Sequence, residues 1–187
     1  MDVTDLLPYI EEKNRLHPEY KTTIFHCLVA AVARVITMRP YLNRFICGRK
    51  LYERNEISLS FVAKRKFVDH SEESLMTLIA KDDMNLDYVT RKIVGDVKEL
   101  RESRGNNDFD GVINAIGSLP NPILHLFIRI LQRLSASGHL PDVLTQGDTN
   151  HTTVLLSNLG SIQCPCCYHH LNNYGTNSIL ITVGVLK

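Results

Sequence analysis

The stretch TTIFHCLVAAVARVITMRP, Thr22–Pro40, carries the strongest structural signal in the chain. A threonine suited to capping a helix precedes a run that is apolar on most sides, and Pro40 ends the run because proline cannot continue a helix. A helix that is apolar over most of its surface is buried in a core. We therefore expect a helix over Thr23–Met38, packed on one face of a sheet.

Segments with a period of two residues supply that sheet. The chain turns at Gly48, and apolar residues then alternate with polar or small ones over Ile57–Ala63, as in a hairpin or a pair of strands. SLMTLIAK is a further candidate strand, and TTVLLSN and SILITVGVL lie near the C-terminus. We expect the strands near Ile57–Ala63, Thr153–Leu156 and Ile179–Val185 to share one sheet.

Further helical patterns surround these strands. They cover DVTDLLPYIEEKNRLH at the N-terminus, Leu86–Arg104 and a shorter segment near Phe109–Ile116. PNPILHLFIRILQRLSASG is apolar enough to predict a second largely buried helix. The order helix, helix, strands, helices, strands is typical of an α/β or α+β two-layer domain.

Composition places the chain among ordinary globular proteins with a single domain. Its 187 residues are 44% apolar and 22% charged, and its formal net charge is +1. We expect no nucleic-acid partner from this charge balance. We also expect no membrane partner, because the most apolar stretches fall short of the ~20 residues that a span needs. No secretion signal is visible, so we expect a cytoplasmic protein whose five cysteines stay reduced.

CPCCYHH, Cys164–His170, gathers three cysteines and two histidines. Zinc ligands usually occur in separated pairs, and neighbouring residues of an extended chain point to opposite sides, so we expect no metal here. The Cys-x-x-Cys formed by Cys164 and Cys167 does not open a helix after a strand, which is where a helix dipole lowers a thiol pKa. We interpret the segment as a loop between two strands.

Motifs for nucleophilic catalysis and phosphate binding do not occur in the sequence. The serines lie outside a Gly-x-Ser-x-Gly elbow, and no glycine-rich loop follows a predicted strand. His26 and His125 fall inside the two helices expected to be buried. We therefore expect both to be core histidines rather than catalytic bases.

Three segments resemble the catalytic domain of the 2-oxo acid dehydrogenase acyltransferases, whose fold the chloramphenicol acetyltransferases share. HCLVAAVARVITMRPYLNRFICGRKLYERNEISLSFVAKRKF resembles that domain's helix, its Pro and Leu-Asn turn (Pro40–Asn43 here) and its next two strands. TTVLLSNLGSI is similar to its Phe-Thr-Ile-Ser-Asn-Leu-Gly strand and turn, and NSILITVGVLK to the strand that follows. SASGHLPDVL and SNLGSI together resemble the short, lipoyl-free bacterial members. The resemblance implies a chloramphenicol-acetyltransferase-like α/β two-layer sandwich, with a mixed sheet and helices on one face.

The resemblance also implies an activity. In the family, an acceptor thiol or hydroxyl attacks an acyl-CoA thioester, a histidine of a His-x-x-x-Asp-Gly motif takes the acceptor's proton, and a serine hydroxyl stabilises the oxyanion. That serine corresponds to Ser157. The implied partners are acyl-CoA as substrate, a small-molecule or lipoyl acceptor, and further copies of the chain in a homotrimer, with no bound cofactor.

The family's base motif does not occur in this sequence. The chain reaches Lys187 shortly after its last predicted strand, and NNDFDG, with Asn106 where the histidine belongs, precedes the serine strand. We therefore expect a single acyltransferase-like domain over residues 1–187 that is incomplete on its C-terminal side and inactive as it stands. The alternatives are a non-catalytic oligomerisation or scaffold subunit and a small zinc-binding module.

Overall fold

The computed structural model describes residues 2–64, 73–81, 84–102, 117–118, 120–137, 148–172 and 174–186. The elements, in chain order, are helices α1 (Leu6–Leu16) and α2 (Ile24–Met38), the 3-10 helix η1 (Pro40–Asn43), strands β1 (Arg44–Cys47), β2 (Lys50–Glu53), β3 (Ile57–Lys64) and β4 (Glu73–Ala80), helices α3 (Leu86–Glu102) and α5 (Asn121–Ser137), the 3-10 helix η2 (Thr149–His151), strand β5 (Val154–Asn158), the 3-10 helix η3 (Leu159–Ile162) and strand β6 (Ile179–Val183).

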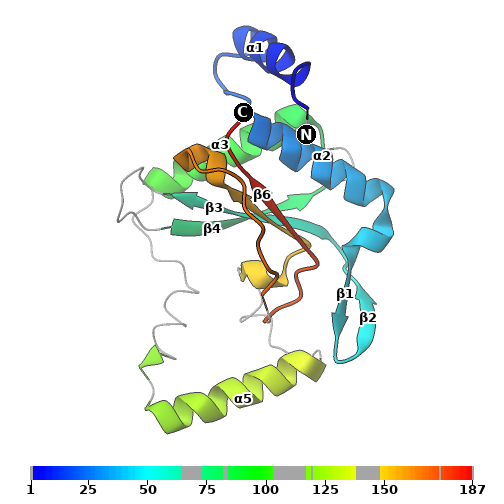
Figure 1. Cartoon of the computed structure of the whole chain (residues 1–187), viewed down its shortest axis with the longest axis vertical. Coiled ribbons are helices and arrows are strands. Elements are labelled where there is room, and N and C mark those ends of the chain that lie inside the picture. Colours follow the sequence, from blue (N-terminus) through cyan, green and yellow to red (C-terminus); the bar gives the residue numbers. More distant parts are fainter. Residues whose placement is uncertain are drawn as a thin grey trace.

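A mixed four-stranded sheet in the order β4-β3-β5-β6 forms the centre of the molecule (Figure 1). β3 pairs antiparallel with β4 and parallel with β5, and β5 pairs parallel with β6. β1 and β2 form a separate antiparallel hairpin, whose turn residues Gly48 and Arg49 both have positive φ. The strands predicted from the sequence and their common sheet are confirmed, including β4.

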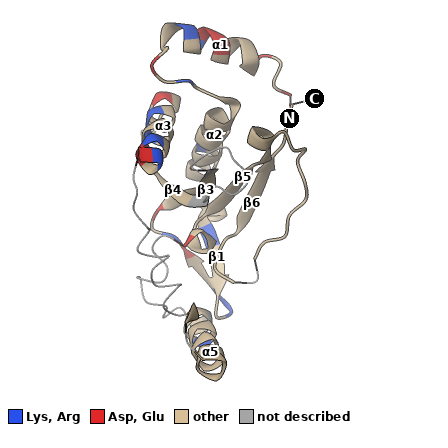
Figure 2. Cartoon of the chain, turned by 90° about the vertical axis from the view of Figure 1, so that its left-hand side faces the viewer, with Lys and Arg blue, Asp and Glu red and all other residues tan. Residues whose placement is uncertain are grey.

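α2 and α3 cover one face of this sheet (Figures 1 and 2). Buried side chains from both helices meet those of β3, β4 and β5 in one apolar core, made of Val29, Ala33, Ile36, Leu59, Phe61, Leu78, Val89, Ile93, Val154 and Leu156. Burying each large side chain stabilises the fold by about 1.5–3 kcal/mol. The predicted packing of Thr23–Met38 against the sheet is confirmed, with Thr23 as the cap and α2 beginning at Ile24.

A capping box closes the first turn of α2. The Thr23 backbone N–H donates to Nδ1 of His26 over 3.1 Å, and His26 is buried. Burial lowers the pKa of His26, because the charged imidazole is poorly solvated inside the protein. The prediction that His26 is a core histidine with a satisfied hydrogen bond is confirmed.

Asn43, at the end of η1, ties the hairpin to the central sheet. Its buried side chain donates from Nδ2 to the carbonyl oxygens of Arg54 (3.2 Å) and Glu56 (3.1 Å). Its Oδ1 accepts from the Thr153 hydroxyl at 2.8 Å. The Ser58 N–H donates to that same hydroxyl oxygen at 3.0 Å, and the Thr153 N–H donates to the Ser58 carbonyl at 2.9 Å. One amide side chain therefore joins the start of β3 to the start of β5.

α5 corrects the prediction of a second buried helix. The helix forms over Asn121–Ser137, but most of its side chains are exposed, and it stands apart from the central sheet and from α2 (Figure 1). His125 is exposed as well, so the prediction of a core histidine at this position was wrong. The apolar pattern predicted the helix correctly, but the helix does not join the core, and part of its apolar side faces solvent.

The remaining helix predictions divide into two groups. α1 and α3 confirm the helices expected at the N-terminus and after Leu86. The short helix expected near residues 109–116 lies outside the described residues. None of the helices in the described ranges has both the length and the apolarity that crossing a membrane requires.

The lowered pKa of His26 predicts a pH-dependent difference between the wild type and His26→Gln. In the unfolded chain the histidine titrates near its ordinary value of 6.5, whereas in the folded chain it stays neutral to lower pH. Below that value the unfolded state binds more protons, so the wild type loses stability as the pH falls. Glutamine accepts the same capping bond without titrating. Urea unfolding between neutral and mildly acidic pH will show a smaller loss of unfolding free energy for His26→Gln than for the wild type. Equal losses would contradict the assignment of His26 as a buried, neutral capping residue.

Candidate active site

Ser157, the predicted oxyanion donor, lies near the C-terminal end of β5 and pairs with Thr182 of β6. Side chains alternate between the two faces of a strand. Since Val154 and Leu156 belong to the core, Ser157 faces the side of the sheet that α2 and α3 leave uncovered. Its side chain is half-buried, and its hydroxyl makes no hydrogen bond with the described part of the chain. The hydroxyl therefore has hydrogen-bonding capacity left for a bound molecule.

The turn after Ser157 is held by local contacts. Asn158 ends β5, and η3 follows, with the Ser161 hydroxyl donating to the Asn158 carbonyl at 2.7 Å. Gly160 lets this turn approach the end of β6 closely: a Cβ at this position would lie 2.9 Å from the Gly184 carbonyl oxygen. The Ser-Asn-Leu-Gly sequence therefore brings the serine close to the C-terminal end of β6.

The segment rich in Cys and His packs against that same end of β6. The Val185 N–H donates to the Cys164 carbonyl at 3.1 Å, and the Thr182 hydroxyl donates to the Cys167 carbonyl at 2.7 Å. A Cβ on Gly184 would collide with the Cys166 backbone, so only glycine fits at this position. The predicted loop between two strands is confirmed, and it lies beside Thr182, the strand partner of Ser157.

The side chains of this loop do not converge. Cys164, Cys166 and Cys167 are free and exposed, and His169 and His170 are exposed too. Within the described ranges, no group of three or more Cys, His, Asp or Glu side chains is arranged to hold a metal ion. The expectation that this segment binds no metal stays a prediction, which metal analysis of the purified protein would test.

A cluster of polar side chains lies at the other end of β5 and β6. Arg54 donates from Nη1 to the His151 carbonyl at 2.6 Å, and from Nη2 to the carbonyl and hydroxyl oxygens of Thr176 at 2.7 and 2.8 Å. Its guanidinium lies 4.5 Å above the Phe45 ring. Burial lowers the pKa of Arg54 to about 10, so the group is still a cation at neutral pH. Arg54 therefore joins the hairpin to the turns that precede β5 and β6.

Asp148 and His151 form a buried carboxylate–imidazole pair in this cluster. Asp148 Oδ2 lies 3.1 Å from His151 Nδ1, and only 6% and 10% of the two side chains are exposed. Burial raises the pKa of the Asp148 carboxyl, but hydrogen bonds from His151 and Asn150 outweigh it and hold the pKa below its ordinary value. His151 Nε2 is buried without a partner among the described residues. An Asp–His pair of this kind is also how enzymes orient a general base.

The Asp148–His151 pair and Ser157 lie at opposite ends of β5. His151 ends η2 before the strand begins, whereas Ser157 is the last residue but one of the strand. His151 is placed to fix the turn before β5 instead: its carbonyl accepts from Arg54, and its ring contacts that of Tyr174 edge-on, with 5.4 Å between the ring centroids. We therefore assign Asp148 and His151 a structural role.

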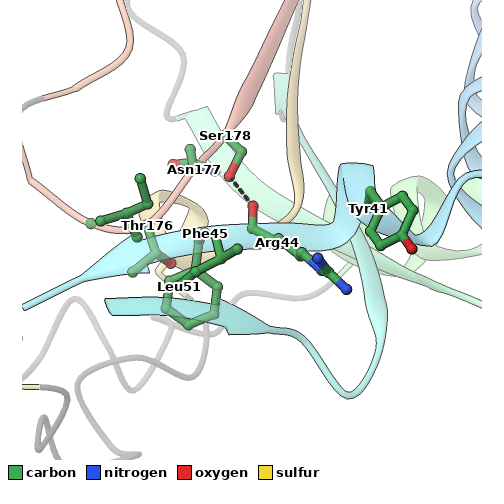
Figure 3. A pocket seen from close by; sticks show the side chains of 9 residues that line it. Tyr41, Arg44, Phe45, Leu51, Thr176, Asn177 and Ser178 are labelled. Carbon is green, nitrogen blue, oxygen red and sulfur yellow. Dashed lines mark hydrogen bonds between the residues drawn. The ribbon is translucent and has the colours of Figure 1, made fainter. Parts of the chain in front are cut away.

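An open pocket of about 550 Å³ lies between the hairpin and the segment that leads into β6 (Figure 3). The Arg44 guanidinium lies 4.3 Å over the Tyr41 ring, and the Arg44 carbonyl accepts from the Ser178 hydroxyl at 2.7 Å. Ser178 precedes Thr182 by four residues, so the pocket is about 13 Å along the strand from Ser157. The residues lining it are Tyr41, Arg44, Phe45, Ile46, Leu51 and Gly175–Ser178.

The sequence analysis predicted Ser157 but missed the cluster around Arg54. Asp148 and His151 are three residues apart, a spacing that indicates little outside a known helix. Arg54 lies 97 residues before His151, and no local pattern links residues at that separation. Only the sheet order, which places β3 beside β5, brings them together.

Comparison with known proteins identifies the fold. No protein-family model and no curated protein matches this sequence. A probable dihydrolipoamide acetyltransferase from Listeria monocytogenes matches with a TM-score of 0.62 and 16% identity, over 100% of this chain and 62% of that one. The fold is that of dihydrolipoamide acetyltransferases.

Two further structures agree with this fold. The dihydrolipoamide acetyltransferase of Azotobacter vinelandii, for which roles of a serine, a histidine and an asparagine in the catalytic mechanism have been investigated, matches with a TM-score of 0.56 and 15% identity, over 96% of this chain and 58% of that one. The cubic core of a pyruvate dehydrogenase multienzyme complex gives the same values. This chain spans less than two thirds of the length of each of these proteins. The α/β sandwich implied by the resemblance is confirmed.

Gly184 provides a test of the packing beside Ser157. Gly184→Ala forces the Cys164–Cys167 backbone away from β6, and we expect it to cost about 1–3 kcal/mol of unfolding free energy. Gly95→Ala is the matched control, because Gly95 is exposed on α3 with nothing within 4 Å of the place that an alanine Cβ would take, and alanine there stabilises a helix by about 0.5–1 kcal/mol. Urea unfolding measures both changes. Equal tolerance of the two substitutions would contradict the close packing of this loop on β6.

Proposed function

We propose that this chain is a domain of the acyltransferase type, built to bind the reacting groups of a transfer from acyl-CoA to a thiol or hydroxyl acceptor, and inactive at neutral pH as it stands. The observation that carries the proposal is the position of Ser157. Its hydroxyl lies at the end of β5, on the uncovered face of the sheet, without a hydrogen-bond partner in the described residues. It occupies the Ser-Asn-Leu-Gly turn in a fold shared with dihydrolipoamide acetyltransferases.

The proposed role of Ser157 is to stabilise an oxyanion. When the acceptor attacks the thioester carbonyl, negative charge develops on the carbonyl oxygen, and a hydroxyl aimed at that oxygen donates a hydrogen bond to it. The new bond joins the acyl carbon to the acceptor, and the CoA thiolate leaves. Removing one such donor typically costs about 10²–10³-fold in rate.

The acceptor must also lose a proton, and the His-x-x-x-Asp-Gly motif that supplies the family's base does not occur in this sequence. His26 accepts the capping bond of α2, and His151 is held by Asp148 at the other end of β5. A positioned base typically contributes about 10²–10⁴-fold. We therefore infer that the 187-residue chain transfers acyl groups at no more than the background rate at neutral pH.

A pair of assays tests both parts of this proposal. With acetyl-CoA and dihydrolipoamide at neutral pH, we expect no rate above background. At a pH above the ordinary thiol pKa of about 8.5, the acceptor is already a thiolate and needs no base. There the wild type should exceed the uncatalysed exchange, and Ser157→Ala should remove the excess.

Ser161→Ala is the matched control, because the Ser161 hydroxyl bonds to the Asn158 carbonyl and is exposed. It should keep the rate of the wild type at alkaline pH. No excess rate at any pH, or an excess that survives Ser157→Ala, would overturn the assignment of Ser157. Robust turnover at neutral pH that is abolished by His169→Ala or His170→Ala would instead show that the loop supplies the base.

We also propose that the chain forms a homotrimer. One matched structure is a cubic core, and cubic symmetry contains threefold axes. Analytical ultracentrifugation should therefore give three times the chain mass of 21.2 kDa. If the chain forms a trimer but shows no acyl transfer that Ser157→Ala removes, the alternative of a non-catalytic scaffold subunit is favoured.

A further inference from the structure

α5 separates its apolar and polar residues cleanly. At 3.6 residues per turn, its large apolar side chains fall on one side of the helix, and Asn121, His125, Arg129, Gln132 and Arg133 fall on the other. A helix with this pattern needs an apolar partner along one side.

The described part of the chain covers only part of the apolar side. Leu124, Phe127, Leu131 and Leu134 are half-buried. Ile128, at the edge next to Asn121, is 39% exposed, and three other apolar residues are exposed more, by 53% at Ile123, 61% at Leu126 and 47% at Ile130. Around the helix, these three lie between the half-buried residues and the two arginines. The surface that α5 turns to solvent is therefore an apolar stripe with Arg129 and Arg133 along one edge.

The tip of the hairpin adds positive charge to this surface. Cys47 Sγ donates to the Ser135 carbonyl, which holds the end of β1 against the last turns of α5. The exposed residues Arg49 and Lys50 follow directly in the turn, and the tip lies beside the C-terminal end of α5 (Figure 1). Neither α5 nor the tip from Ile46 to Leu51 contains an acidic residue.

We propose that this surface, made by the exposed stripe of α5 and the hairpin tip, binds peripherally to membranes that contain anionic lipids. Ile123, Leu126 and Ile130 enter the boundary between headgroups and acyl chains, while the arginines and Lys50 reach the lipid phosphates. The 17 residues of α5 span about 25 Å, so the helix lies in the plane of the interface and does not cross the bilayer. This proposal is independent of the proposed acyl transfer.

The charge of the surface favours lipid over a second copy of the chain. In a symmetric contact between two copies, the same patch meets itself. Arg129, Arg133, Arg49 and Lys50 would then face like charges without an acidic residue to pair with. An anionic lipid surface offers the opposite charge together with an apolar layer. The expectation of no membrane partner rested on apolar stretches too short to span a bilayer, and peripheral binding by a helix that lies in the interface needs no such span.

Co-sedimentation of the full chain with vesicles tests the proposal. We expect binding to phosphatidylcholine vesicles that contain phosphatidylserine, and much weaker binding to pure phosphatidylcholine. Leu126→Glu combined with Ile130→Glu should abolish binding, because it puts two carboxylates into the apolar stripe. Arg129→Gln combined with Arg133→Gln should weaken partitioning roughly tenfold or more, since each cation near such a surface contributes about a fivefold gain.

Leu16→Glu is the matched control, because Leu16 is 64% exposed on α1, away from this surface. It should bind vesicles as the wild type does. Unchanged circular dichroism and urea unfolding show that each variant is folded. Absence of binding to either vesicle, or binding that survives the double glutamate variant, would overturn the proposal. A wild-type oligomer that the double glutamate variant dissociates in the absence of lipid would assign the stripe to a second copy instead.

Discussion

The fold depends on one buried amide, that of Asn43. The chain leaves α2, turns through η1 and forms a hairpin before it enters the central sheet, and this path has little apolar burial of its own. Asn43 bonds to two carbonyl groups on the far side of the hairpin and to the hydroxyl of Thr153 at the start of β5. Because a buried polar group left unpaired costs about 1–3 kcal/mol, these bonds make any other path of the hairpin unfavourable.

The position of the candidate site follows from that constraint. Thr153 is held by Asn43 and Ser58, so the first residues of β3 and β5 are fixed in their parallel register. Arg54 adds bonds to the turns before β5 and β6. With its N-terminal end anchored in this way, β5 carries Ser157 to the opposite end of the sheet, where the close approach of Gly160 and Gly184 holds the following turn. A group placed on a strand with this support is held more precisely than one on a free loop.

Local patterns in the sequence were sufficient for most of the fold. The all-round apolarity of α2 predicted a buried helix, and the alternation in β3, β5 and β6 predicted one sheet. The place of Ser157 on its strand followed from the resemblance of TTVLLSNLGSI to the family's strand and turn. The prediction that α5 is buried in the core failed. An apolar face indicates that a helix packs against an apolar surface, but it does not say which surface that is. The Arg54 cluster was missed, because its members meet only once β3 and β5 are paired.

A double-mutant cycle between Asn43→Ala and Thr153→Val tests most directly whether this amide joins the two strands. The cycle compares the unfolding free energies of the wild type, both single variants and the double variant, and so isolates the interaction between the two side chains. We predict a coupling energy of about 1 kcal/mol or more, as for a buried hydrogen bond. Losses that add within about 0.3–0.5 kcal/mol, as for independent sites, would contradict the account.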